Sequence, residues 1–165
     1  EVLNHLKGLQ RWDVTWQILT KRAERMQVYF AEDSLEDRLT ELWAGDDPDK
    51  QAWNLMLPLT NIHLGVSIEN QAMADERLPH LLRTPAAVRF LSCEPLLSGI
   101  DFFYGDGDWG LLTGISWVVC GGESGSNARP CKVDWIRAIV EQCRTAGVAC
   151  FREARFGSKA GTATE

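Results

Sequence analysis

Residues 62–94, IHLGVSIENQAMADERLPHLLRTPAAVRFLSCE, contain two apolar runs separated by a polar, helix-like stretch. The runs, Ile62 to Ile68 and Ala87 to Ser92, do not alternate strictly with polar residues, which is typical of strands covered on both faces. Asn70 is a good N-cap for the intervening helix, and Pro79 is expected to kink or split it. The stretch therefore predicts a strand–helix–strand unit with parallel strands.

The same pattern continues on both sides of this unit. Further strands are predicted at Thr15 to Thr20, Ile115 to Cys120 and Val148 to Phe151. We therefore predict an α/β fold, a parallel sheet of about five strands with helical crossovers, either open or partial TIM-barrel-like. A complete eight-stranded barrel typically needs about 250 residues, more than the 165 in this chain.

Three more helices are expected between these strands. Lys21 to Phe30 has apolar residues at helical spacing, and another helix is expected to start at Ser34. Asp134 is expected to cap the last helix, and Gly147 to end it. The crossover between the third and fourth strands has no helical period and is expected to be irregular. Three tryptophans on apolar faces are expected in the core: Trp16, Trp117 and Trp135.

Length and composition predict one domain. With 45% hydrophobic residues, residues 1–156 are expected to form a single α/β domain, and the polar tail 157–165 is expected to be disordered. The opening residues, EVLNHLKGLQ, already have a helical pattern, so an N-terminal portion is expected to be missing.

Charge and hydropathy indicate the compartment. The net charge of −6 does not indicate a nucleic-acid-binding surface, and neither a signal peptide nor a long apolar run is present, so a cytoplasmic protein without a membrane span is expected.

The five cysteines have no metal-binding pattern. Their spacings of 27, 11, 12 and 7 residues contain no CxxC pair and no zinc-finger signature. We expect buried thiols in a reducing compartment, and no residue is predicted as a metal ligand. The residues are Cys93, Cys120, Cys131, Cys143 and Cys150.

Charged residues follow the predicted strands at the points where they end. Lys21 follows the first strand, Glu69 the second, Glu94 the third and Glu123 the fourth. Ligands bind at the carboxyl ends of parallel strands, so these four are the candidate catalytic residues. The carboxylates suit a hard divalent cation, or general acid–base chemistry with Lys21 neutralising an anionic substrate. Alternatively, they cap helices or pair with Lys21 and with the following arginines: Arg22, Arg89 and Arg129.

The segment GGESGSNARP, residues 121–130, is the candidate cofactor-binding loop. Gly121 and Gly122 allow backbone to approach a ligand, and Ser124 and Gly125 offer amide groups to an anion. The segment matches neither a GxGxxG motif nor a P-loop, and a tight turn without a ligand is the alternative.

These motifs together resemble a known family. WQILTKRAERM, the stretch from His63 to Leu97 and the stretch from Ile115 to Val148 resemble an uncharacterised phage and bacterial family with a three-cysteine motif and a radical S-adenosylmethionine-like barrel. The resemblance implies that Lys21, Glu69, Glu94 and Glu123 line the pocket for substrate and cofactor. It also implies S-adenosylmethionine and an iron–sulfur cluster, although the family's N-terminal cysteine cluster has no counterpart here.

Three hypotheses follow from the sequence. The first is an enzyme or enzyme fragment whose Glu/Lys mouth binds a small cofactor or an anionic substrate. The second is a carboxylate-metal enzyme that acts on an anionic substrate. The third is a non-catalytic binding or scaffold protein that forms a homo-oligomer through open sheet edges.

Overall fold

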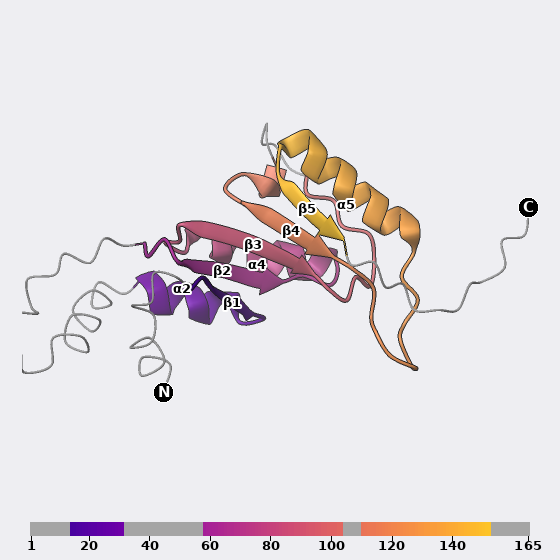
Figure 1. Ribbon diagram of the computed structural model, residues 1–165, viewed down its shortest axis with the longest axis horizontal. Coiled ribbons are helices and arrows are strands. Elements are labelled where there is room, and N and C mark those ends of the chain that lie inside the picture. Colours follow the sequence, from indigo (N-terminus) through magenta and orange to yellow (C-terminus); the bar gives the residue numbers. More distant parts are fainter. Residues whose placement is uncertain (1–13, 32–57, 104–109, 153–165) are drawn as a thin grey trace, which may run out of the picture.

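The computed structural model describes residues 14–31, 58–103 and 110–152. They form a five-stranded parallel sheet in the order β1-β2-β3-β4-β5, flanked by helices (Figure 1). The strands are β1 (Trp16–Thr20), β2 (Ile62–Ser67), β3 (Val88–Cys93), β4 (Trp117–Cys120) and β5 (Ala149–Arg152). The helices are α2 (Ala23–Ala31), α4 (Gln71–Arg83), the short 3-10 helix η3 (Gly110–Leu112) and α5 (Val133–Ala146).

The predicted α/β class and the five parallel strands are confirmed. Each observed strand begins and ends within two residues of its predicted position, because apolar runs of this length mark buried strands well. Within the described residues the sheet is open, with β1 and β5 at its two edges, and barrel closure is not observed.

One face of the sheet packs against the helices. The register places Leu64, Val66, Leu91 and Val118 on this face, and they belong to one buried cluster. All three α-helices of the described residues contribute side chains to the same cluster, so they cover the same face of the sheet. In Figure 1, α4 lies behind β2 and β3, and α5 lies beside β5. The helical side chains are Ala23 and Met26 of α2, Ala74, Leu78 and Leu81 of α4, and Ile136, Ile139 and Cys143 of α5.

The opposite face carries a row of aromatic side chains. Phe90 of β3 stacks on its register partner Trp117 of β4, with ring centroids 4.1 Å apart and an interplanar angle of 6°. Phe151 of β5 meets Trp117 edge-on at 6.1 Å. A Cβ atom on Gly65, the register partner of Phe90 on β2, would lie 2.5 Å from the Phe90 ring, so this glycine makes room for the ring. Phe90 is 3% exposed and is not part of the buried cluster to which the helices contribute.

The tryptophan predictions were only partly correct. Trp135 is half-buried and packs against the helix-covered core. Trp117 lies instead on the aromatic face, and Trp16 is 37% exposed because β1 is an edge strand of the described sheet.

Helix α4 begins as predicted but is not split. The Asn70 side chain accepts a hydrogen bond from the Met73 amide at 3.0 Å, which confirms the N-cap. Pro79 was expected to kink or split this helix, and the split does not occur: α4 is one helix from Gln71 to Arg83. Burial of Leu78 and Leu81 on either side of Pro79, together with a Thr84 hydroxyl that donates to the His80 carbonyl at 2.8 Å, stabilises its last turn.

Helix α5 starts differently from the prediction. Lys132, not Asp134, is the N-cap, and it makes no side-chain capping bond. Asp134 lies in the first turn, where its charge is favourable for the helix dipole and pairs with Arg137. Gly147 ends the helix in a left-handed conformation with φ of 70°, as predicted.

Some predictions fall outside the described residues. They concern the helix from Ser34, the N-terminal portion and the tail 157–165. Among the residues that are described, no helix has the length and apolar character needed to cross a membrane.

Candidate functional site

The carboxyl ends of three neighbouring strands are joined by backbone hydrogen bonds. The Leu97 amide donates to the Glu69 carbonyl, and the Leu96 amide donates to the Gly121 carbonyl, each at 2.8 Å. The segment after β3 therefore lies between the residues that follow β2 and those that follow β4. We call the region at the carboxyl ends of the strands, which contains Lys21, Glu69, Glu94 and Glu123, the strand-end mouth.

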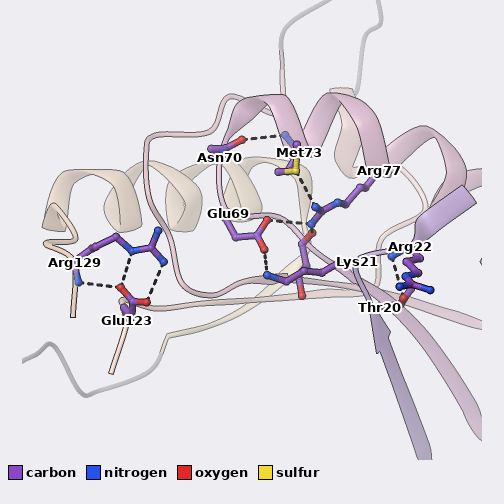
Figure 2. Close-up of polar contacts among 10 residues, drawn as sticks. Thr20, Lys21, Arg22, Glu69, Asn70, Met73, Arg77, Glu123 and Arg129 are labelled. Atoms are coloured by element: carbon purple, nitrogen blue, oxygen red, sulfur yellow. Dashed lines mark hydrogen bonds and ion pairs between the residues drawn. The ribbon is translucent and has the colours of Figure 1, made fainter. Parts of the chain in front are cut away.

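Glu69 is the centre of an ion-pair network in this mouth. Its carboxylate pairs with Lys21, which follows β1, and with Arg77 of α4, whose Nη1 atom lies 3.0 Å from Oε2 (Figure 2). Arg77 also donates to the Ser67 carbonyl at 2.7 Å. The side chains of Glu69 and Arg77 are 9% and 10% exposed, whereas Lys21 is 61% exposed. Two cations therefore surround one buried carboxylate, and only Lys21 faces solvent.

The network keeps Glu69 ionised. Burial raises the pKa of the Glu69 carboxyl, but the hydrogen bond from Lys21 and the charge of Arg77 outweigh burial, so the net shift of the pKa is downward. A carboxylate with this pKa accepts hydrogen bonds at neutral pH and is a poor proton donor.

Arg77 was missed as a site residue. It lies three residues after Ala74 and four before Leu81, inside the buried stripe of α4. A charged residue at such a position needs a partner, and this was a usable signal in the sequence.

Glu123 forms a separate pair in the mouth. Both carboxylate oxygens accept from the Arg129 guanidinium, at 2.8 and 3.0 Å, and Oε2 also accepts from the Arg129 amide at 2.9 Å (Figure 2). The side-chain hydrogen bond from Arg129 lowers the pKa of Glu123 to about 2. The sequence analysis raised the alternative that the glutamates pair with nearby cations. This is what both Glu69 and Glu123 do.

Glu94 follows β3 directly and is half-buried, and its peptide bond to Pro95 is cis. The register pairs Cys93 with Cys120, so Glu94 is level with Gly121, the residue that follows β4. Arg89, expected as a glutamate partner, instead donates to the backbone carbonyls of Leu81 and Thr84.

The glycine loop is only partly available to a ligand. Gly121 is buried, and its amide donates to the Cys93 carbonyl at 3.3 Å. A Cβ atom on Gly122 would lie 3.1 Å from the Cys131 Cβ, so this glycine allows close packing within the protein. Ser124 and Gly125 are exposed, and Gly125 has φ of 109°. The binding roles of these four residues stay predictions.

The described residues do not provide a metal centre. Nowhere in ranges 14–31, 58–103 and 110–152 do three or more His, Cys, Asp or Glu side chains form a group that could hold a metal ion. The described cysteines are all free thiols. These residues therefore do not fit an iron–sulfur cluster, and they do not support a metal ion shared by the three glutamates.

Comparison with known proteins gives a family. Residues 4–161 match the family described as "Protein of unknown function (DUF5131)". The chain belongs to this family. Neither the curated proteins nor the solved structures contain a match to the chain.

The DUF5131 match includes every strand of the sheet and all four predicted catalytic residues. The first part of the expected resemblance, an uncharacterised family, is therefore correct. The family description names no radical S-adenosylmethionine chemistry and no phage origin.

Proposed function

We propose that this DUF5131 protein binds a small anionic ligand at the strand-end mouth. The observation that carries the proposal is the Lys21–Glu69–Arg77 network. Its two cations and one carboxylate leave one net positive charge at the carboxyl ends of β1 and β2. The protein as a whole has a net charge of −6, so this local excess is opposite in sign to the whole chain.

Within this proposal, each residue has a separate role. Glu69 and Arg77 are positioning residues, since both are buried and hold Lys21 at the rim. Lys21 is the ligand contact, because its ammonium group has three donors and its side chain is 61% exposed. Ser124 and Gly125 offer exposed amides on the far side of the mouth, and Glu94 is the candidate acid or base there.

The ligand class is tested by calorimetry on the full chain with two probes. Inorganic phosphate tests simple anion binding, and S-adenosylmethionine tests the cofactor implied by the family resemblance. Lys21→Ala removes a charged contact and is expected to weaken binding of the effective probe about tenfold or more.

Arg144→Ala is the matched control, because it removes one positive charge from the last turn of α5, at the other end of that helix from the mouth. If both variants weaken binding equally, Lys21 acts only through its long-range charge and does not contact the ligand. If phosphate does not bind, the anion proposal is contradicted, whether or not S-adenosylmethionine binds, because S-adenosylmethionine carries a net positive charge at neutral pH.

We also propose that the chain self-associates through its sheet edges and aromatic face. Leu19 on β1 and Phe151 on β5 are 48% and 59% exposed, on the two edge strands of the described sheet. Such surfaces favour association. Leu19→Lys and Phe151→Lys are expected to lower the sedimentation coefficient at high concentration, whereas Val140→Lys on α5 leaves it unchanged. A wild-type chain that sediments as a monomer at all concentrations contradicts this second proposal.

A further inference from the structure

Four cysteines from four elements contribute to the core on the helix-covered face of the sheet, although they do not form a group that could hold a metal ion. The register pairs Cys93 with Cys120, and both lie in the buried cluster with Cys143 of α5. Cys150 of β5 packs against that cluster. These residues are 7 to 57 positions apart in the sequence, and the βα connections bring them together.

Cys120 and Cys150 form a close thiol pair. Val118 is the register partner of Cys150, so Cys120 lies two residues further along the neighbouring strand and on the same face. The two Sγ atoms are 3.9 Å apart. A disulfide has an S–S distance of about 2.05 Å, so the sulfurs need to approach by about 2 Å to bond. Because the two residues are a diagonal pair, the bond also requires the backbone at the end of β4 or in the edge strand β5 to shift.

The two thiols differ in access and in acidity. Cys120 is completely buried, whereas Cys150 is half-buried on an edge strand of the described sheet. Hydrogen bonds from Cys120 and Cys143 lower the pKa of the Cys150 thiol. The hydrogen bond to Cys150 and burial raise the pKa of Cys120. Because Cys150 is the half-buried member of the pair, it is the thiol that a peroxide can reach, and its lowered pKa favours the nucleophilic thiolate there.

We propose that Cys150 is a site of oxidation by hydroperoxides and that Cys120 is its resolving partner. The Cys150 thiolate attacks hydrogen peroxide, the O–O bond breaks, and Cys150 becomes a sulfenic acid while hydroxide leaves and takes up a proton as water. The Cys120 sulfur then attacks the sulfenic sulfur. The S–S bond forms, the S–O bond breaks, and the hydroxyl leaves with the thiol proton as a second water. Two thiols and one peroxide thus give one disulfide and two waters.

This crosslink would join the end of β4, which lies at the mouth, to the edge strand β5. Cys120 is the last residue of β4, directly before Gly121, Gly122 and Glu123. A disulfide to β5 therefore restrains the start of the candidate ligand loop. The site stands on the thiol geometry alone and is independent of anion binding at the mouth.

The experiment treats the reduced full chain with hydrogen peroxide and then alkylates the remaining thiols. Five free cysteines minus the two in the disulfide leave three thiols that react after denaturation. Trypsin, a glutamate-specific protease and chymotrypsin then place each cysteine on its own peptide, through cuts after Phe102, Trp117, Glu123, Lys132 and Arg144. We expect one crosslinked pair that contains Cys120 and Cys150.

Variants separate this site from general oxidation. Cys150→Ser is expected to abolish the crosslink and to keep all four remaining thiols reactive at the same peroxide dose. Cys131→Ser, which removes a half-buried thiol outside the group, is expected to leave the crosslink intact. In the wild-type chain, five alkylated thiols, a crosslink through Cys131 or Cys143, or crosslinks only between chains would each overturn the proposal.

Discussion

Arg77 Nη1 lies 3.0 Å from Glu69 Oε2, and both side chains are about nine-tenths buried. This contact joins α4 to the residue that follows β2, and the Ser67 carbonyl accepts a second hydrogen bond from the same nitrogen at 2.7 Å. A buried ion pair of this kind gives little net stability, but loss of one partner is costly because the other charge stays buried.

The first prediction concerns this buried pair. Glu69→Gln keeps the size of the side chain but leaves the Arg77 charge without a carboxylate. We expect a loss of about 3 kcal/mol in the free energy of unfolding, the cost typical of a broken buried ion pair. Urea denaturation followed by circular dichroism measures it. Glu141→Gln, which breaks the exposed pair with Arg144, is the control and is expected to change stability little. If the two variants lose the same stability, burial of the Glu69–Arg77 pair does not make its loss more costly than that of an exposed pair.

The second prediction concerns pH. The folded-state pKa of the Glu69 carboxyl lies below its ordinary value, so protonation favours the unfolded chain. The stabilising contribution of Glu69 is therefore fully present above the unfolded pKa and is lost as pH falls through the lower, folded pKa. We expect the difference in unfolding free energy between wild type and Glu69→Gln to shrink below about pH 4.5, and to be constant between pH 6 and 8.

Glu123 provides a comparison in the same pH range. Its pKa of about 2 also lies below the ordinary carboxyl value, so its pair with Arg129 persists to lower pH. The carboxylate is more exposed than that of Glu69, and solvent weakens the pair. Glu123→Gln is therefore expected to change the pH profile less than Glu69→Gln does. A larger change for Glu123→Gln would show that the Glu123–Arg129 pair, which follows β4, contributes more to stability than the Glu69 network.

The strands could be predicted from sequence because each is a short apolar run between turn residues, as in residues 62–68. The ends of those runs also placed Lys21, Glu69 and Glu123 together at the carboxyl ends of the strands. The partners of these residues could not be predicted, because Arg77 reaches Glu69 only through the packing of α4 on β2. Likewise, the 3.9 Å approach of Cys120 to Cys150 depends on strand register, which their spacing of 30 residues does not reveal.

The third prediction tests the aromatic face. A Cβ atom at residue 65 would lie 2.5 Å from the Phe90 ring, closer than side-chain atoms approach one another. Gly65→Ala is therefore expected to displace Phe90 from its stack on Trp117 and to cost about 1–3 kcal/mol. Urea denaturation gives the cost, and near-ultraviolet circular dichroism reports the aromatic stack.

A double-mutant cycle provides the control for Gly65→Ala. In a Phe90→Ala background the added methyl group meets no ring, so Gly65→Ala should cost less there than in wild type. The same cost in both backgrounds would mean that the methyl group acts on the strand backbone and not on Phe90.

The fourth prediction concerns the start of α4, the helix that supplies Arg77. Asn70 Oδ1 accepts from the Met73 amide at 3.0 Å, and Asn70→Ala removes this acceptor. We expect a loss of about 1 kcal/mol, the usual cost of an N-cap side chain. Asn70→Asp keeps an acceptor and adds a charge that the helix dipole favours, so it should retain most of the stability. Thermal unfolding of the two variants distinguishes them. If both variants lose the same stability, the side-chain nitrogen of Asn70, and not its capping oxygen, provides the stabilisation.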